Sequence, residues 1–310
     1  MNNNISPYTN NLFEQPWWLD IVAQNEWREA VVKEGDEIVG RFPYYFHDGK
    51  IELPTLTQTC GMWIRNKEQS VNDVLSREKK IIEGLLEQLP DFKSFKVALD
   101  SSREYFLPFL WKGFRVSPRV SYRIKDLSNI DQVYANFSKT VKKNIKSAQK
   151  KVKVVTQSDV EVLLNIMDKT FAAQGRKYPI SKDILRNIVA ECDRRGNGKM
   201  YTAIDEQGNV HACSYFVFDD EVFYYLIAGS DAQYRSSGAQ TLILWEAIRY
   251  AAEKSKIFDF EGSMVEGIET FFRRFGGEPV VYYEIRKQGV FGEVYEALKP
   301  KIKNILGYKS

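Results

Sequence analysis

The chain has 310 residues, of which 44% are hydrophobic and 14% aromatic, so it can bury a large core and is long enough for two ordinary domains. Its 44 basic and 41 acidic side chains leave a net charge of +3, which does not indicate nucleic acid as an obligatory partner. The three widely spaced cysteines predict neither a disulfide framework nor a zinc site. With a polar, uncharged N-terminus and no apolar run that could span a bilayer, we expect a cytoplasmic protein.

The second half of the chain has the clearer pattern. Apolar residues recur at helical spacing over 159–171 and again over 184–192, which predicts two helices. Three stretches rich in β-branched and aromatic residues follow, with turn residues between them, and predict an antiparallel meander. The predicted strands of the meander are 199–204, 210–218 and 221–228, and a helix over 236–253, a strand over 256–260, a helix over 268–275 and a strand over 279–286 complete this half.

The first half repeats this order of elements. Its predicted elements are a helix over 14–24, strands over 29–33 and 38–46, a helix over 71–89, a strand over 95–99, a helix over 103–111 and a strand over 115–124. When the halves are compared, Asp100 lies opposite Glu261, each at the end of a short strand. We interpret this as a divergent internal duplication, and the alternative is chance similarity of two α/β halves. The predicted fold is α/β, an α+β arrangement with a mixed sheet, built from two tandem units.

Between the halves lies a predicted amphipathic basic helix, residues 138–153, that contains no acidic residue. Its lysines are Lys139, Lys142, Lys143, Lys146, Lys150, Lys151 and Lys153. Most of them share one helical face, and apolar residues share another. Two interpretations stay open: a solvated face on a connecting helix, or contact of Lys139 and Lys143 with the phosphates of a polyanionic substrate.

Three segments carry a resemblance to a known family. The segment from Ser138 to Lys150 has the pattern Ser-x-x-x-Lys-x-x-Ile-x-x-Ala-x-Lys, the strand end reads Asp259-Phe260-Glu261-Gly262-Ser263, and a Gly-Ile-x-x-Phe-x-Arg-x-Phe-Gly run covers 267–276. In this order they resemble the GNAT N-acetyltransferase superfamily. Within it they are similar to the tandem branch of Fem peptidoglycan aminoacyltransferases and of acetyltransferase-like proteins from polysaccharide gene clusters. The resemblance is strong over residues 130–287 and weak in the N-terminal half.

The resemblance implies different roles for different parts of the chain. Residues 1–125 would form a degenerate GNAT-like unit that binds the acceptor or is structural, residues 126–157 a basic connecting helix, and residues 158–290 the catalytic GNAT-like unit. Residues 291–310 are predicted to form an amphipathic helix rich in lysine. This helix could rest on an anionic membrane at its inner face, and packing back onto the domain is the alternative.

The resemblance also implies a donor site. In GNAT folds the pyrophosphate of an acyl-coenzyme A sits on backbone amides at the start of the helix after the meander. The corresponding residues here are Arg235, Ser236, Ser237, Gly238 and Ala239, with fewer glycines than the usual signature. The donor is left open between acyl-CoA and aminoacyl-tRNA, neither of them a tightly bound cofactor, and a plain helix start is the alternative.

Acyl transfer to an amine needs a deprotonated acceptor, stabilisation of the oxyanion and a proton for the leaving group. Glu261 lies where a strand leaves the sheet, with Asp259 two positions before it, and its phenylalanine neighbours could raise its proton affinity for work as a general base. Tyr225 is the candidate for returning a proton. The alternatives are that Glu261 caps a helix or pairs with Arg273, and that Tyr225 only packs.

Arg273 and Arg274 are candidate substrate-binding residues, because the guanidinium fork binds phosphate or carboxylate, although exposed arginines are common on helices. Only two histidines occur, so no metal site is expected. The sequence predicts an N-acyltransferase that moves an acetyl or aminoacyl group directly to an amine of an amino sugar or another cell-envelope precursor, either a small molecule or a lipid-linked sugar. Partners would include tRNA if it is the donor, but no DNA. The alternative is a non-catalytic polysaccharide-assembly or binding protein that retains the fold.

Overall fold

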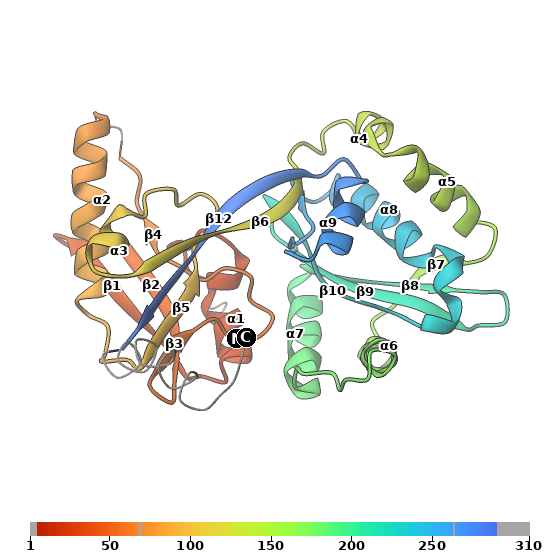
Figure 1. The fold of residues 1–310 in the computed structure, drawn as a ribbon, viewed down its shortest axis with the longest axis horizontal. Coiled ribbons are helices and arrows are strands. Elements are labelled where there is room, and N and C mark those ends of the chain that lie inside the picture. The colour runs from red at the N-terminus through yellow and green to blue at the C-terminus, as the bar shows by residue number, and fades with distance from the viewer. Residues whose placement is uncertain (1–4, 68–69, 263, 290–310) are drawn as a thin grey trace, which may run out of the picture. The chain divides into compact units, whose positions relative to one another are not determined.

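The computed structural model describes residues 5–67, 70–262 and 264–289, which form two compact units (Figure 1). Unit 1 comprises Met1–Arg119 together with Val281–Ser310, and unit 2 comprises Val120–Val280. The chain enters unit 2 within strand β6 (Arg115–Ile124) and leaves it within strand β12 (Glu278–Gln288). The segment 291–310, predicted above to form a helix, lies outside the described residues.

Unit 1 is built on a mixed sheet. Its strands are β1 (Trp27–Glu34), β2 (Glu37–His47), β3 (Lys50–Glu52), β4 (Trp63–Ile64) and β5 (Ser94–Ala98), together with β12. Strand β3 runs parallel to β5, and the other pairs of the order β1-β2-β3-β5-β12 are antiparallel, while β4 pairs with β2. The helices are η1 (Leu12–Glu14), α1 (Pro16–Val22), α2 (Val71–Leu86) and α3 (Leu107–Trp111).

Unit 2 has the predicted meander. Its strands are β7 (Lys153–Thr156), β8 (Gly198–Ile204), β9 (Val210–Phe218), β10 (Val222–Ser230) and β11 (Ile257–Asp259), together with β6. Its helices are α4 (Ile130–Asn136), α5 (Lys139–Ala148), α6 (Val160–Ala172), α7 (Lys182–Arg195), η2 (Ala232–Ser237), α8 (Ala239–Ala251) and α9 (Glu266–Arg273). Strands β8, β9 and β10 pair antiparallel, and β11 runs parallel to β10. Helices α6 and α7 cover one face of this sheet, and α8 covers the other with α5 packed on it (Figure 1).

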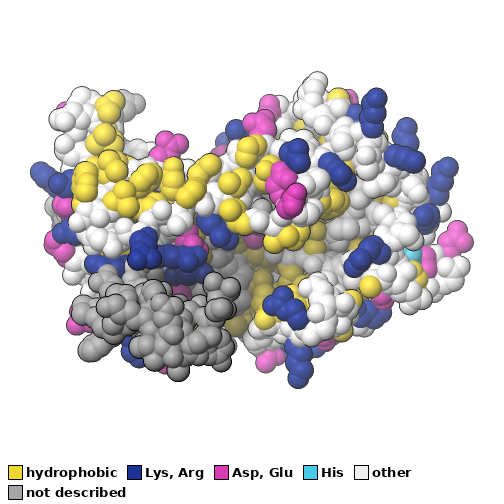
Figure 2. Space-filling view, viewed as in Figure 1, with side chains coloured by type: hydrophobic (Ala, Val, Ile, Leu, Met, Phe, Trp, Pro, Cys, Tyr) yellow, Lys and Arg dark blue, Asp and Glu magenta, His cyan; other side chains and the backbone are white. Residues whose placement is uncertain are grey.

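Helix α5 carries the lysines of the predicted basic helix. Ser138 caps it by accepting a hydrogen bond from the Val141 N–H, and its apolar residues Val141, Ile145 and Ala148 are buried. Lys139 and Lys143 are exposed, and Lys and Arg side chains line the edge of the molecule over α5 (Figure 2). The amphipathic helix is therefore confirmed, but it is shorter than predicted, because the chain turns after Lys151 into strand β7, which the lysine-rich composition had concealed.

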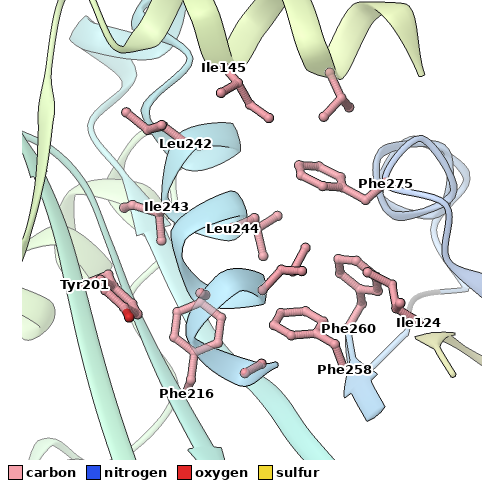
Figure 3. Close-up of a cluster of buried hydrophobic side chains, with 14 of the residues drawn as sticks. Ile124, Ile145, Tyr201, Phe216, Leu242, Ile243, Leu244, Phe258, Phe260 and Phe275 are labelled. Carbon is pink, nitrogen blue, oxygen red and sulfur yellow. The ribbon is translucent and has the colours of Figure 1, made fainter. Parts of the chain in front are cut away.

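The core of unit 2 lies between its sheet and α8, and it is dominated by aromatic rings. Figure 3 shows residues from several helices and strands converging there, namely Ile145, Phe216, Leu242, Ile243, Leu244, Phe258, Phe260 and Phe275. Phe258 stacks on Phe223 and meets Phe260 edge-on at 4.9 Å between ring centroids. Full burial of so many rings fixes the position of the short strand β11, and with it the residues that follow.

The units exchange their last strands. Strand β5 is followed along the chain by α3 and β6, yet the strand that pairs antiparallel with β5 is β12. Strand β11 is followed by α9 and β12, yet its antiparallel partner is β6. The described residues from Val281 on therefore group with unit 1.

The backbone hydrogen bonds of the exchanged strands fix the correspondence between the units. The Leu99 N–H donates to the Tyr283 carbonyl in unit 1, and the Phe260 N–H donates to the Tyr122 carbonyl in unit 2, each at 2.9 Å. Asp100 and Glu261, the next residues, therefore occupy equivalent places. This agrees with the comparison of the two sequence halves, which places Asp100 opposite Glu261.

Helices α3 and α8 begin later than the sequence predicts. Helix α3 starts at Leu107 rather than 103, in accord with Pro108 in its first turn, where a missing N–H is tolerated. Helix α8 starts at Ala239 rather than 236, because Gly238 has a φ of 77° that a helix interior excludes. The residues before it form the 3-10 helix η2.

Candidate active site

The site begins at Asp259, the last residue of β11, whose side chain is fully buried. Its carboxylate accepts hydrogen bonds from the Ser121 hydroxyl at 2.5 Å, from the Arg123 Nε at 2.7 Å and from the Glu261 N–H at 2.7 Å. Ser121 and Arg123 belong to the exchanged strand β6. Asp259 thus has a full set of partners, and through the last of these bonds it holds the backbone of Glu261.

Glu261 combines strain with an unsatisfied carboxylate. Its φ of 55° lies in the left-handed region, which costs about 1 kcal/mol or more in a residue with a side chain. Its Oε1 atom is buried and has no hydrogen-bond partner among the described residues. Burial, and next the nearby charge of Asp259, raise the pKa of Glu261 well above its ordinary value. A strained turn thus presents a carboxylate that binds a proton readily.

Gly262 makes this turn feasible. Its φ is 54°, and a Cβ atom at this position would lie 2.4 Å from the Val120 carbonyl oxygen and 2.5 Å from the Ser121 Cα. The contacts are with backbone, so no side-chain rotation can relieve them. Glycine is therefore the residue that lets the chain pass this close to β6.

We expect Gly262→Ala to displace the turn and lower activity more than it lowers binding of the donor, because the displaced group is Glu261. Steady-state kinetics measure the activity, and titration of the protein with the donor measures its binding. Gly267→Ala is the matched control, because nothing lies near a Cβ at that helical position. Equal behaviour of the two variants would contradict the role given to Gly262.

The equivalent carboxylate of unit 1, Asp100, has partners for both oxygens. It accepts a hydrogen bond from the Asn11 Nδ2 at 2.8 Å and another from the Ser102 N–H at 2.8 Å. Within the described residues, the Oε1 atom of Glu261 lacks a hydrogen-bond partner, whereas both carboxylate oxygens of Asp100 have one. This difference favours unit 2 as the unit with a chemically available carboxylate.

Tyr225 lies on β10, on the face of the sheet that α8 covers. Its hydroxyl accepts a hydrogen bond at 2.7 Å from the Gln240 Nε2, which also donates to the Ser214 hydroxyl at 2.7 Å. Its ring stacks on Phe216 and meets Phe272 edge-on, and Phe272 in turn stacks on Phe260, the neighbour of Glu261. Burial raises the pKa of Tyr225, so the hydroxyl keeps its proton at neutral pH.

The predicted donor residues lie on η2 and at the start of α8. Arg235 and Ser236 are exposed, and the buried Ser237 accepts a hydrogen bond from the Ala239 N–H at 3.2 Å. Gly238 contacts α5, since a Cβ there would lie 3.4 Å from Ala148. The Lys151 Nζ donates to the Ser236 carbonyl at 3.1 Å, so this segment is also held from the end of α5.

The other end of α5 reaches the predicted substrate-binding arginines. The Ser138 N–H donates to the Arg274 carbonyl at 2.9 Å, and Phe137 packs edge-on against Phe275. Arg273 pairs with Glu269 at 2.9 Å, and Arg274 is exposed. Helix α5, with Lys139 and Lys143 exposed, therefore connects the donor segment at one end with Arg274 at the other.

Sequence reasoning missed the residues that hold Asp259 and Tyr225 in place. Ser121 and Arg123 are distant from Asp259 in the chain, and Gln240 sits in a helix without a recognisable motif. The strand exchange brings Ser121 and Arg123 to Asp259, and no local pattern predicts that pairing. The signal in the sequence was the polar composition of residues 121–123 within an otherwise strand-like segment.

Comparisons with known proteins agree with this geometry. Residues 135–273 match the family model described as an acetyltransferase (GNAT) domain, whereas curated protein sequences gave no match. The chain is similar to the crystal structure of FemX, with a TM-score of 0.65 and 13% identity over 93% of this chain and 95% of that one. It is also similar to a tandem GNAT protein from the clavulanic acid biosynthesis pathway, with a TM-score of 0.54 and 12% identity over 89% of each chain. L-PGS from Bacillus licheniformis gives a TM-score of 0.55 and 10% identity over 86% of each chain.

Proposed function

We propose that the protein is an N-acyltransferase with its reaction centre at Glu261, because residues 135–273 match the model of a GNAT acetyltransferase domain and the fold is similar to that of a tandem GNAT protein. The observation that carries the proposal is the buried Oε1 of Glu261 on a strained turn, which has no hydrogen-bond partner within residues 5–67, 70–262 and 264–289. Natural proteins rarely leave a buried polar atom without a hydrogen-bond partner. The amine of a bound substrate could be the partner of this oxygen. Asp100, the equivalent residue of unit 1, has hydrogen-bond partners for both of its carboxylate oxygens.

In the proposed reaction Glu261 accepts a proton from the acceptor amine, and the amine nitrogen attacks the acyl carbonyl carbon. The new bond is C–N, and the bond that breaks joins the acyl carbon to the sulfur of a thioester or the oxygen of an aminoacyl ester. The leaving group then takes a proton. Tyr225 is the proposed source of that proton, since its hydroxyl carries a proton and lies on the same face of the sheet as α8.

Two donors fit the residues of unit 2. An acyl-CoA would place its pyrophosphate at Arg235 and the start of α8, where the segment from Ser236 to Ala239 would supply backbone contacts. An aminoacyl-tRNA would use the basic face of α5, including Lys139 and Lys143, with Arg273 and Arg274 at its end. Neither donor would be a tightly bound cofactor.

The proposed acceptor is an amine of an amino sugar or another cell-envelope precursor, as a small molecule or on a lipid carrier. Support comes from the sequence resemblance to the Fem-like branch and from the fold shared with FemX. No described helix is both long and apolar enough to cross a membrane. The proposed location is the cytoplasm, with peripheral contact at the inner membrane face.

One observation favours a second function, that of a non-catalytic envelope-assembly protein. The Ala239 N–H, a donor that a pyrophosphate would use, is already bonded to the Ser237 hydroxyl. Incubation of the protein with acetyl-CoA and, separately, with charged tRNA distinguishes the two functions by ligand-dependent thermal stabilisation. Stabilisation by neither donor would favour the non-catalytic protein.

We expect Arg235→Ala to raise the KM for an acyl-CoA by about tenfold with little change in kcat, because an exposed guanidinium contributes to phosphate binding and not to the chemical step. Steady-state kinetics with the donor varied would measure this. Arg249→Ala, which removes an exposed arginine of α8, is the control. An unchanged KM would remove Arg235 from the donor site.

If aminoacyl-tRNA is the donor, the double variant Lys139→Gln/Lys143→Gln should weaken its binding and reduce the slope of log K against log salt by about two. Titration at several salt concentrations would measure the slope. Lys177→Gln/Lys254→Gln, on exposed lysines outside α5, is the matched control. A slope that falls equally in both double variants would show nonspecific binding.

A further inference from the structure

Several large apolar side chains on helices α2 and α3 of unit 1 are exposed to solvent. Helix α3 presents Leu107, Leu110 and Trp111 to solvent, with exposed fractions of 41%, 42% and 58%. On α2, Val71 and Leu75 are 76% and 38% exposed. Val71 lies two helical turns before Lys79, and Leu75 lies one turn before it. The Lys79 Nζ is 5.1 Å from the centre of the Trp111 ring. We call these five apolar residues the α2–α3 surface.

The folding of unit 1 does not account for this exposure. Helix α3 already has a buried side, formed by Pro108 and Phe109, and Phe109 meets Phe114 edge-on at 5.7 Å in the core. The leucines and the tryptophan are on the opposite side. Contiguous exposed apolar side chains of this kind mark a surface that contacts a partner or a membrane.

Most of the charges beside the α2–α3 surface are positive. Residues 105–115 contain no acidic side chain, and Lys112 and Arg115 are exposed. The Lys287 Nζ donates to the Lys112 carbonyl at 2.8 Å, which adds a third cation to those two. The exposed acid within the surface is Asp73, which lies between Val71 and Leu75 and accepts a hydrogen bond from the Ser70 hydroxyl. In Figure 2 hydrophobic side chains gather over α2 and α3 at the upper left, with Lys and Arg side chains below them.

We propose that the α2–α3 surface docks the protein on a bilayer that contains anionic lipid. Leucines and a tryptophan flanked by cations are the composition that binds the interface of such a bilayer, with the indole at the level of the headgroups. A protein partner would call for fewer lysines at the centre, because protein interfaces are depleted in them, and Lys79 lies against Trp111 itself. This rests on the peripheral membrane contact of the proposed function and deepens it by placing that contact on unit 1, on a surface that includes none of the residues assigned to transfer.

Sedimentation of the full chain with vesicles tests the proposal. The vesicles are phosphatidylcholine alone and phosphatidylcholine mixed with phosphatidylglycerol. We expect binding to the mixed vesicles, and about a tenfold or greater loss of that binding in Leu110→Ser/Trp111→Ala, because both side chains supply buried apolar area. The variant should keep its melting temperature and its acyl transfer to a soluble amine, because both residues are exposed.

Two further variants test whether the vesicle contact is specific to the α2–α3 surface. Ile5→Ser/Val281→Ser removes two other exposed apolar side chains of unit 1 and should bind as the unchanged protein does. Lys79→Gln/Lys112→Gln should weaken binding only to the vesicles that contain phosphatidylglycerol. Absence of binding to mixed vesicles would overturn the proposal, as would binding that survives Leu110→Ser/Trp111→Ala, which would place the contact elsewhere. A dimer in solution that this variant dissociates would also overturn it, in favour of a second copy of the chain.

Discussion

Glu261→Gln should lower the rate of acyl transfer by about a hundredfold or more while leaving the protein folded. Glutamine has nearly the same shape and cannot accept a proton from the acceptor, so binding of the donor should persist. The melting temperature should stay the same or rise, because the buried Oε1 of Glu261 has no partner to lose in the part of the chain that the structure describes. Single-turnover kinetics and thermal unfolding measure the two quantities.

The pH dependence of stability supplies a second readout of the same group. The pKa of Glu261 in the folded protein lies well above its ordinary value of 4.5, so the folded state binds this proton more tightly than the unfolded chain does. The stability gained in this way is fully present below 4.5 and is lost as the pH rises through the raised pKa. Transfer should show the opposite trend and increase as Glu261 loses its proton.

The stability of the protein also falls with rising pH because of the buried Glu14 of unit 1. Burial is the largest cause that raises the pKa of Glu14, to about 7. The difference between the unchanged protein and Glu261→Gln cancels this shared contribution. That difference in the free energy of unfolding should therefore change with pH, with Glu261→Gln gaining relative to the unchanged protein as the pH rises. If activity and stability fall together in Glu261→Gln at every pH, then Glu261 is structural and the proposed function fails at its central residue.

Asp259→Asn should be the most destabilising single change at the site, lowering the free energy of unfolding by about 3 kcal/mol. The substitution removes the charge that faces the Arg123 guanidinium at 2.7 Å, and both side chains are largely withdrawn from water. Asparagine retains an oxygen that can accept from the Glu261 N–H, so the turn keeps its anchor. Denaturant unfolding measures the change.

Two controls locate the cause of this loss. Ser121→Ala removes the hydroxyl that donates to Asp259 and should cost about 1 kcal/mol, since it deletes one hydrogen bond and no charge. Asp205→Asn, at the turn between β8 and β9, replaces a carboxylate with several hydrogen bonds and should cost less than Asp259→Asn. An Asp259→Asn protein as stable as the unchanged one would mean that the Arg123 pair contributes nothing to the fold.

The local patterns of the sequence predicted the helices, the meander and the repeat. Apolar spacing located α6 and α7, and the equivalence of Asp100 with Glu261 was readable because both end short strands. The positive φ of Glu261 could not be read, since glutamate rarely adopts it and only the close approach of Gly262 to β6 imposes it here. The ion pair between Arg123 and Asp259 also depends on a strand pairing between residues far apart in the chain.

The exchanged strands also bear on how the chain folds during synthesis. Strand β5 leaves the ribosome early, but its partner β12 is among the last described segments to emerge. Until then the edge of β5 has unpaired backbone groups that can pair with other strands, a state prone to aggregation. Unit 2, by contrast, already has β6 when β11 is made. Although unit 1 comes first in the sequence, it is the unit that must wait for the rest of the chain before its sheet is complete.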